Sequence, residues 1–281
     1  MSSSTEPDRY AVIGHPVKHS LSPFIHGLFA KQTRQHLTYR LLEVEPDQLR
    51  DAVQRFFDEG GKGLNVTVPH KQAICALVKH RTPRAEIAGA VNTVAAQGAG
   101  LLGDNTDGAG LITDLTRNLD FPLLEQRILI LGAGGAARGA LGPLLAASPA
   151  YCEVANRNAD RARALTEEFA ALGEVRGCGF DEITAQPFDL ILNATSASLQ
   201  SAVPPIPAGA VAPTTLCYDM VYGKEDTAFT TWAKLVGAGR CELGWGMLVE
   251  QAAEAFLLWR GMRPDTAPVL EALRASQRRD D

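Results

Sequence analysis

Residues 127–140 read RILILGAGGAARGA, and the fold of the surrounding region follows from this stretch. The apolar run Ile128–Leu131 predicts a buried strand of a parallel sheet, and a helical pattern begins just after the glycine-rich turn. A Gly-x-Gly-x-x-Ala turn between strand and helix is typical of dinucleotide binding. Gly132 permits the tight turn, Gly134 lets a pyrophosphate approach, and Ala137 is small enough for close packing. The alternative is a turn with a purely structural role.

The next predicted strand, Tyr151–Ala155, indicates which dinucleotide would bind. In NAD-binding versions an acidic residue at its end hydrogen-bonds the ribose 2′-hydroxyl. Here Arg157 stands near that position, and Arg161 follows one helical turn later. Two guanidinium groups suit a 2′-phosphate, so we predict NADP rather than NAD. The alternative is a pair of surface arginines on a solvated helix.

Composition excludes several classes of protein. The chain has 281 residues, 46% of them hydrophobic and 21% charged, with a net charge of −5, so no nucleic-acid-binding surface is expected. The five cysteines are scattered without a CxxC pair, which favours buried thiols. We expect neither a signal peptide nor a membrane span, and therefore a cytoplasmic protein.

The first seventy residues alternate between strand and helix patterns, which favours a parallel α/β sheet. Ser22 precedes Pro23, so we expect Ser22 to cap a helix that runs to about Arg34. Ser20 has no such structural role, and the two hydroxyls together suit a polyhydroxylated or carboxylate ligand. His15 and His19 have no acidic or thiolate partner nearby in sequence, so no metal site is expected. The expected strands are Tyr10–Ile13, Tyr39–Val44 and Gly63–Val68, with a helix from Pro46 between the last two.

Lys71 breaks a local rule. Pro69-His70-Lys71 predicts the start of a helix, where a lysine meets the positive end of the helix dipole. That field would lower the pKa of Lys71 and suit it to proton transfer. The alternative is an exposed lysine that points away from the helix.

Asn92 and Asp107 are candidate partners of Lys71. Asn92 stands at the start of a predicted strand, and Asp107 precedes the helix predicted from Ala109 to Asn118. Asp107 could simply cap that helix. As an ionised carboxylate it could also form a proton-transfer pair with Lys71, although sequence alone leaves open whether they meet.

These motifs, in this order, resemble the shikimate dehydrogenase family over nearly the whole chain from Tyr10 to about Leu273. The motifs that carry the resemblance are Ser20-Leu-Ser22-Pro23, Asn65-Val-Thr67-Val-Pro69-His-Lys71, Gly89-Ala-Val-Asn92-Thr93, Gly103-Asp-Asn-Thr-Asp107-Gly108, the glycine-rich turn, Asn156-Arg157, Asn193-Ala-Thr-Ser196, Tyr218-Asp-Met220-Val-Tyr222 and Gly246-Met247-Leu-Val-Glu-Gln251.

The resemblance implies roles for individual residues. Lys71 and Asp107 would be the catalytic pair. Substrate hydroxyls and carboxylate would be held by these two and by Ser20, Ser22, Asn65, Thr67, Asn92, Tyr222 and Gln251. NADP would contact Gly132, Ala133, Gly134, Gly135 and Ala136 through its pyrophosphate, Asn156, Arg157, Asn158 and Arg161 through its adenosine end, and Met220, Gly244 and Met247 through its nicotinamide.

The chain departs from the family pattern at three places in the cofactor region. Ser198 stands where a glycine is common, Asn158 where a threonine is common, and Leu243 where an aspartate is common. These differences affect details of the cofactor loops and leave the expected reaction class unchanged.

The resemblance also implies a two-domain α/β architecture. An α/β substrate domain of residues 1–107, completed by 244–281, would surround a doubly wound, Rossmann-type NADP-binding domain of residues 108–243. Hinges are expected at the two segments that flank the dinucleotide-binding region, Gly108-Ala-Gly110 and Gly237-Ala-Gly239. The active site would lie in the cleft between the domains. Met247 and Gln251 lie four residues apart on one predicted helix and therefore share a face.

The expected function is the reversible NADPH-dependent reduction of 3-dehydroshikimate to shikimate, by a monomer or a homodimer with no nucleic-acid or membrane partner. Two alternatives stay open. One is a quinate/shikimate dehydrogenase with broader cofactor use. The other is a shikimate-sensing module that keeps the fold without catalysis, which the presence of Lys71, Asp107 and the glycine-rich turn disfavours.

Overall fold

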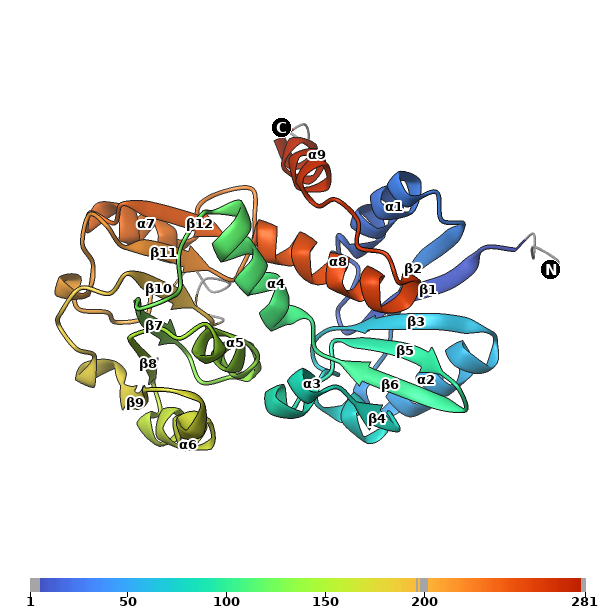
Figure 1. Cartoon of the computed structure of the whole chain (residues 1–281), viewed down its shortest axis with the longest axis horizontal. Coiled ribbons are helices and arrows are strands. Elements are labelled where there is room, and N and C mark those ends of the chain that lie inside the picture. The colour runs from blue at the N-terminus through green and yellow to red at the C-terminus, as the bar shows by residue number, and fades with distance from the viewer. Residues whose placement is uncertain (1–5, 196, 198–201, 279–281) are drawn as a thin grey trace. The chain divides into compact units, whose positions relative to one another are not determined.

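The computed structural model describes residues 6–195, 197 and 202–278 (Figure 1). The chain divides into two compact units. The first contains the residues up to Gly110 and those from Val249 onward, and the second is Leu111–Leu248. Ser196, the last residue of the Asn193–Ser196 motif, and Ser198, one of the departures from the family pattern, lie outside the described residues. No helix in the described part of the chain is long and apolar enough to cross a membrane.

The first unit is built around a sheet with the strand order β2-β1-β3-β5-β6-β4. β1 is parallel to β2 and β3, as the strand-helix alternation predicted. β5 is antiparallel to β3 and β6, because a two-residue loop at Gly98 and Ala99 folds β5 and β6 into a hairpin. The elements before the second unit are β1 (Asp8–Gly14), α1 (Ser22–Thr33), β2 (Leu37–Glu43), α2 (Leu49–Asp58), β3 (Gly61–Val66), β4 (His80–Arg81), α3 (Pro83–Ala88), β5 (Thr93–Gln97) and β6 (Gly100–Asp104), with 3₁₀ turns at Pro46–Gln48 and Ala73–Ala76.

The second unit holds a parallel sheet with the order β12-β11-β10-β7-β8-β9. This is the doubly wound arrangement, in which the strand order reverses between β7 and β10 and ligands bind beyond the carboxyl ends of the strands. Its elements are β7 (Arg127–Leu131), α5 (Gly135–Ala146), β8 (Tyr151–Asn156), α6 (Ala159–Phe169), β9 (Val175–Gly179), β10 (Leu190–Asn193), β11 (Leu216–Asp219), α7 (Ala228–Leu235) and β12 (Arg240–Leu243), with 3₁₀ turns at Ala170–Leu172, Phe180–Glu182 and Ala208–Ala210.

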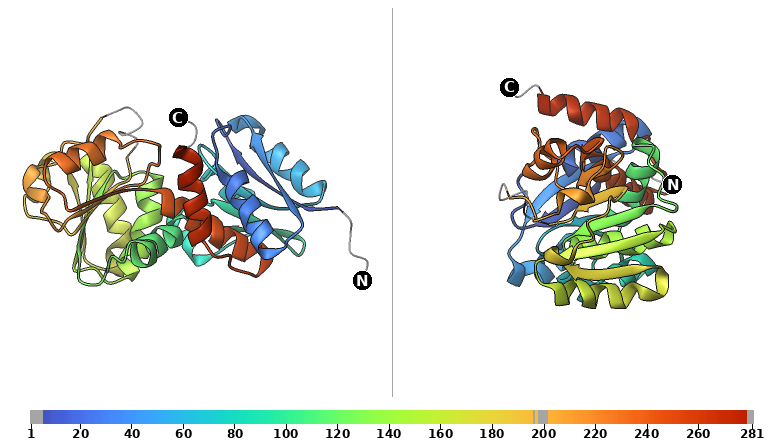
Figure 2. Two further views of the ribbon diagram at one scale, coloured as in Figure 1. Left: turned by 90° about the horizontal axis from the view of Figure 1, so that it is seen from above. Right: turned by 90° about the vertical axis from the view of Figure 1, so that its left-hand side faces the viewer.

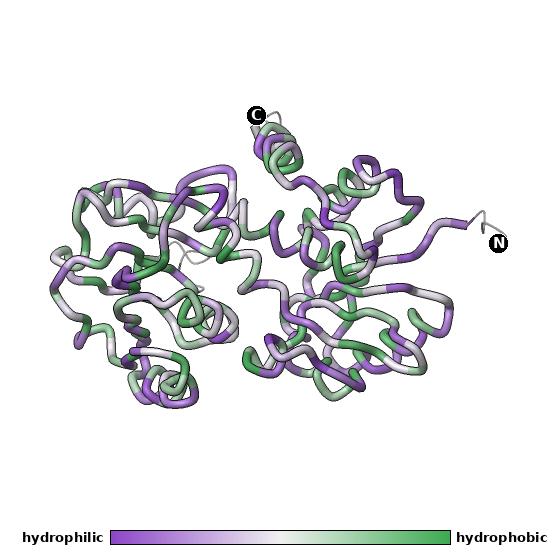
Figure 3. The backbone as a smooth tube through the Cα atoms, viewed as in Figure 1, coloured by the Kyte–Doolittle hydropathy of each residue, from purple (hydrophilic) through white to green (hydrophobic). Residues whose placement is uncertain are grey.

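The strand predicted from the opening motif lies at the centre of this sheet and is buried on both faces. Ile128 and Ile130 pack into the cluster that includes α5 and α6, while Leu129 and Leu131 pack into the cluster that includes α7. Figure 2 shows these helices on opposite faces of the sheet. An uninterrupted apolar run is therefore what this position requires. In both units apolar and polar segments alternate along the chain (Figure 3).

Two helices connect the units. α4 (Asp107–Thr113) continues as a π-helical turn at Asp114–Asn118, and α8 (Trp245–Arg260) precedes the last helix, α9 (Ala267–Arg278). The limits between the units, after Gly110 and after Leu248, fall inside α4 and α8. The expected hinge at 237–239 instead lies within the second unit, where an added Cβ on Gly239 would collide with the Pro213 carbonyl.

Candidate active site

Lys71 and Asp107 meet in the first unit. Lys71 Nζ donates a hydrogen bond to Asp107 Oδ2 over 2.6 Å, and the two side chains remain 34% and 23% exposed. An amine and a carboxylate in contact, still partly open to solvent, have the geometry that a proton-transfer pair requires.

The helix expected to begin at Pro69 is absent. Residues 68–72 form turns, and the next regular element is the 3₁₀ turn Ala73–Ala76. The Lys71 carbonyl accepts the N–H of Val91 over 2.8 Å, and the Cys75 N–H bonds to Gln72 instead. Because those backbone groups are already engaged, an α-helix cannot form there. The prediction that Lys71 lies at a helix N-terminus and feels the helix dipole was therefore wrong. Its contact with Asp107 instead makes Lys71 a candidate for proton transfer.

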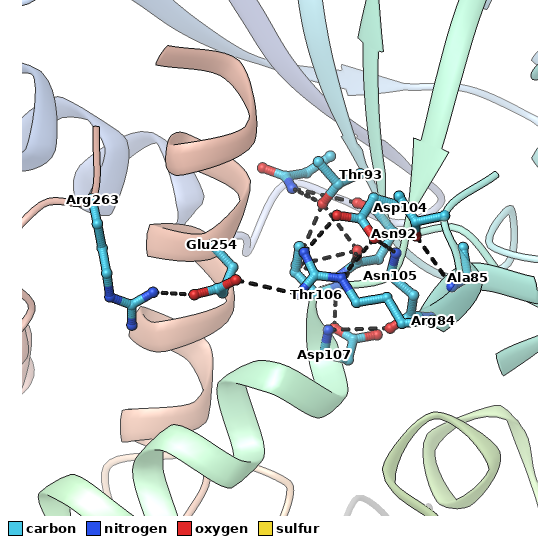
Figure 4. A network of polar contacts seen from close by, with 12 residues as sticks. Arg84, Ala85, Asn92, Thr93, Asp104, Asn105, Thr106, Asp107, Glu254 and Arg263 are labelled. Carbon is cyan, nitrogen blue, oxygen red and sulfur yellow. Dashed lines mark hydrogen bonds and ion pairs between the residues drawn. The ribbon is translucent and has the colours of Figure 1, made fainter. Parts of the chain in front are cut away.

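Asn92 holds the Asp107 carboxylate from the other side. Its Nδ2 donates to Asp107 Oδ1 over 2.8 Å and to Thr106 Oγ1 over 2.9 Å, while its Oδ1 accepts the Thr106 N–H over 2.8 Å (Figure 4). Both amide protons of this buried residue are engaged. Asn92 thus fixes the orientation of the carboxylate that faces Lys71.

The alternative in which Asp107 only caps a helix beginning at Ala109 is not what the structure shows. α4 begins at Asp107 itself, and the Asp107 N–H donates to Asn105 Oδ1 over 3.1 Å. Asn105 is in turn fixed by donating to the Ala90 carbonyl over 3.1 Å. The preceding asparagine therefore satisfies the backbone, which leaves the Asp107 carboxylate for Lys71 and Asn92.

Ser20 and Ser22 lie side by side before α1. Ser20 Oγ donates to Ser22 Oγ over 3.1 Å and accepts the Ser22 N–H over 3.3 Å. The N-cap position of α1 is Leu21, without a side-chain hydrogen bond, so the expectation that Ser22 caps this helix was wrong. Ser20, for which no structural role was predicted, satisfies the first helical N–H.

Asn65 and Thr67 occupy the end of β3. Asn65 Nδ2 donates to Thr93 Oγ1 over 3.1 Å and to the Asn92 carbonyl over 3.3 Å. Both protons of the Asn65 amide are therefore engaged. Its oxygen accepts the Tyr39 hydroxyl and has one further lone pair that could accept from a ligand. Thr67, just past the strand, is partly exposed and donates its N–H to Ile13.

Tyr39 and His26 form a layer behind these residues that sequence reasoning missed. Tyr39 donates its hydroxyl to Asn65 Oδ1 over 2.7 Å, and its ring stacks on His26 with centroids 4.4 Å apart. Burial lowers the pKa of His26 to about 3, although a hydrogen bond with Asn65 opposes the shift. His26 follows Ser22 by one helical turn, and this spacing was the available signal for it.

Gln251 belongs to the part of α8 that lies in the first unit. Its backbone packs so closely on Gly110 of α4 that an added Cβ there would lie 2.6 Å from the Gln251 nitrogen. Glycine at 110 therefore permits the contact that places Gln251 near the helix that begins with Asp107.

The glycine-rich turn of the second unit has the predicted form. Gly132 has φ = 102°, a conformation that favours glycine, and Gly134 is the N-cap of α5. An added Cβ on Gly134 or Gly135 would meet nothing within 4 Å. Open space in front of unpaired helical N–H groups fits a pyrophosphate, with Ala133 and Ala136 in the same turn.

The adenosine end of the predicted cofactor site carries two arginines, Arg157 and Arg161. Arg157 and Arg161 are exposed and form no ion pair with the described residues, whereas Arg163 on the same helix pairs with Asp160 and Glu182. Asn158 caps α6 by accepting the Arg161 N–H over 3.1 Å, and Asn156 donates to the Asn158 carbonyl over 2.9 Å. Two such guanidinium groups beside a capped helix fit a 2′-phosphate.

The predicted nicotinamide residues lie near a buried carboxylate that sequence reasoning missed. Asp114 Oδ2 accepts the Met247 N–H over 3.1 Å and the Tyr218 hydroxyl over 2.7 Å. An added Cβ on Gly244 would lie 2.5 Å from the Met220 carbonyl, so these two segments touch through glycine. Asp114 thus holds the N-terminus of α8, which carries Met247.

Tyr222 also belongs to the second unit, just beyond β11, where its ring lies 5.1 Å from that of Trp245. Burial raises the pKa of Tyr222. The predicted substrate residues apart from Tyr222 are thus gathered in the first unit, and the cofactor residues are gathered in the second. No cluster of at least three described His, Cys, Asp or Glu residues is arranged to hold a metal ion.

Comparison with known proteins covers most of the chain. Residues 12–94 match the shikimate dehydrogenase substrate binding domain, 115–202 the shikimate / quinate 5-dehydrogenase family, and 244–274 the shikimate 5'-dehydrogenase C-terminal domain. The shikimate dehydrogenase (NADP(+)) of Methylococcus capsulatus is 53% identical over 98% of this chain and 99% of its own.

Two solved structures are also similar. An Ael1 enzyme from Pseudomonas putida has 44% identity and a TM-score of 0.90, over 95% of this chain and 98% of the other. The shikimate 5-dehydrogenase of Thermus thermophilus, solved in complex with NADP(H) and shikimate, has 34% identity and a TM-score of 0.84, over 95% of this chain and 99% of the other.

Proposed function

Because this chain belongs to the shikimate dehydrogenase family, we propose that Lys71 and Asp107 perform the proton transfer in the NADP-dependent interconversion of 3-dehydroshikimate and shikimate. The observation that carries this assignment is the 2.6 Å contact between the Lys71 ammonium and a carboxylate that Asn92 holds in place.

The proton step follows from this geometry. When bound, NADPH supplies the hydride that adds to the carbonyl carbon. As the carbonyl π bond breaks, Lys71 donates a proton from Nζ to the developing alkoxide, and Lys71 is reprotonated from solvent. In the oxidation direction Lys71 withdraws the proton from the hydroxyl. Asp107 keeps Nζ oriented through its hydrogen bond to the lysine.

Substrate binding is assigned to polar groups, most of which belong to the same unit as this pair. Ser20 and Ser22 offer hydroxyls to the substrate carboxylate, and Asn65 can accept from a substrate hydroxyl through its oxygen. The other proposed contacts are Thr67, Asn92, Tyr222 and Gln251. Support comes from the fact that most of these residues belong to the first unit, and from the hydrogen-bonding capacity of the two serine hydroxyls and the Asn65 oxygen.

NADP is assigned to the second unit. The glycine-rich turn at 132–136 would receive the pyrophosphate, the Asn156–Arg161 segment the adenosine 2′-phosphate, and Met220, Gly244 and Met247 the nicotinamide. That Arg157 and Arg161 have no ion pair among the described residues supports NADP over NAD, because such a guanidinium gains a partner when a phosphate binds.

The direct test is to follow nicotinamide reduction by absorbance, with NADP or NAD and with shikimate or quinate as separate pairs. We expect strong reduction with NADP and shikimate. Comparable rates with NAD or quinate would instead assign the broader quinate/shikimate activity. A folded protein that binds shikimate and reduces neither cofactor would be a sensing module, against the Lys71–Asp107 assignment.

Two further assignments accompany this proposal. A cytoplasmic location is supported by the free state of all five cysteines, which suits a reducing compartment. The enzyme is proposed to act as a monomer or a homodimer, which sedimentation of the purified chain would decide.

A further inference from the structure

Arg84 lies at the centre of an ion-pair network in the first unit. Its Nε and Nη2 donate to the two oxygens of Asp104 over 2.7 and 2.5 Å, in the two-pronged geometry that only arginine offers. Its Nη1 donates to Glu254 over 3.2 Å. Figure 4 shows Arg84 between these two carboxylates, with Arg263 on the far side of Glu254.

The carboxylate of Asp104 is hydrogen-bonded to the segment that carries Asp107. Asp104 is almost fully buried at the end of β6 and accepts the Asn105 N–H over 2.8 Å. Asn105 in turn accepts the N–H of Asp107. Asp107, whose carboxylate contacts Lys71, thus follows Asp104 by three residues. Hydrogen bonds connect Asp104 to Asn105 and Asn105 to Asp107.

The carboxylate of Glu254 belongs to α8, the helix that carries the proposed substrate residue Gln251. Glu254 follows Gln251 by three residues, so the two lie one turn apart on neighbouring faces of the helix. Arg84 therefore holds the α8 segment that presents Gln251 as well as the loop that presents Asp107, although these segments are far apart in sequence.

We infer that Arg84 is a positioning residue that sets Asp107 and Gln251 relative to one another for substrate binding. The inference rests on the proposed function for the roles of those two residues. The guanidinium hydrogen bonds of Arg84 go to Asp104 and Glu254, so its effect on the site passes through these two carboxylates.

The charges support this arrangement. Burial alone would raise the pKa of Asp104, but the hydrogen bonds from Arg84 and Thr82 hold that pKa below its ordinary value. Loss of the Arg84 fork would leave a buried carboxylate short of its principal partner, so the end of β6 would shift to find another.

The test compares Arg84→Lys, Glu254→Gln and the control Arg260→Lys. Lysine keeps the charge at 84 and loses the fork. Glutamine at 254 removes the ion pairs of this position with Arg84 and Arg263 and leaves the Asp104 pair intact. Arg260 is also on α8, where it pairs with Asp8 over 2.5 Å and donates to Tyr10 and Gln35. None of these partners is a proposed ligand-binding residue. Steady-state kinetics give kcat and the separate KM values for shikimate and NADP, and thermal unfolding reports stability.

We expect Arg84→Lys to raise the KM for shikimate about tenfold and to lower kcat, with the KM for NADP unchanged. Glu254→Gln should raise the shikimate KM about threefold, and Arg260→Lys should lose stability with normal kinetics. A merely structural role would not separate the two KM values.

Unchanged shikimate KM values in Arg84→Lys and Glu254→Gln would overturn the inference. If Arg84→Lys fails to fold, Glu254→Gln alone decides it in the same way. A parallel change of both KM values, matched by Arg260→Lys, would also overturn it. An inactive wild-type chain would instead refute the proposed function, so the two failures are distinguishable.

Discussion

The two halves of the proposed site are built differently. In the first unit the side chains of Lys71 and Asn92 are already hydrogen-bonded to Asp107 in the free protein. The other amide proton of Asn92 is donated to Thr106. In the second unit the cofactor region offers empty space at Gly134, and the guanidinium groups of Arg157 and Arg161 have no ion pair among the described residues. Proton transfer needs fixed geometry in the free protein, whereas cofactor binding needs groups whose partners arrive with the ligand.

The largest effect should come from breaking the proton-transfer pair. Lys71→Ala removes the proton donor and should lower kcat by about a thousandfold while the dissociation constant for NADP stays within a factor of about two. Rapid kinetics measures turnover, and calorimetric titration measures cofactor binding. Turnover within about tenfold of the wild type would remove Lys71 from the mechanism and place the catalytic proton elsewhere.

A smaller effect should follow from removing the two arginine charges of the cofactor region. The double variant Arg157→Ala, Arg161→Ala should raise the KM for NADP by about thirtyfold, because two charge-assisted contacts to the 2′-phosphate are lost. The KM for NAD and for shikimate should stay unchanged. Arg163→Lys is the matched control, since Arg163 is already paired with Glu182. An equal loss of NADP and NAD affinity would contradict the 2′-phosphate assignment.

Substitutions at two glycines of the glycine-rich turn should have different effects, one on NADP binding and the other on stability. Gly134→Ala places a methyl group in open space, so unfolding should be unaffected while the KM for NADP rises about tenfold. Gly132→Ala, at φ = 102°, should instead lower the free energy of unfolding by about 1 kcal/mol or more. Denaturant unfolding and NADP kinetics on both variants test this. Normal NADP affinity in Gly134→Ala would show that the pyrophosphate lies elsewhere.

The smallest effect concerns pH and the first unit alone. Burial lowers the pKa of His26 in the folded protein to about 3. Between about pH 6.5 and 3 the unfolded chain therefore binds a proton at His26 that the folded chain does not bind. The stability contributed by neutral His26 is complete above the unfolded pKa of about 6.5 and falls as the pH drops toward 3. Between about pH 6 and 5 the wild type should lose about 1 kcal/mol more than His26→Gln. Parallel pH profiles of the two proteins in urea would disprove this.

Sequence reasoning succeeded where the structure depends on neighbours along the chain. The strand from Arg127, the glycine-rich turn with the helix after it, and the strand before Arg157 rest on local spacing, and they appear as predicted. The helix at Pro69 failed because Val91, twenty residues after Lys71, takes the Lys71 carbonyl. Such a contact has no trace in local periodicity.

The same limit explains which residues were missed. Tyr39, His26, Arg84 and Asp114 act through side chains that the fold brings together from distant segments, and each looks ordinary within its own strand or helix. The family resemblance covered the residues proposed to touch ligands. The residues that hold those in place emerged only from the three-dimensional contacts.

The course of the chain through its units has a consequence for synthesis on the ribosome. The second unit is one uninterrupted segment, so it can fold once residue 248 has emerged, whereas the first unit waits for the later part of α8. The nascent chain should therefore fold its nucleotide-binding unit first. The unit that carries the proposed catalytic residues should fold last, after Gln251 and Glu254 have left the exit tunnel. A ribosome stalled before that point would carry a chain that can bind a dinucleotide without turning it over.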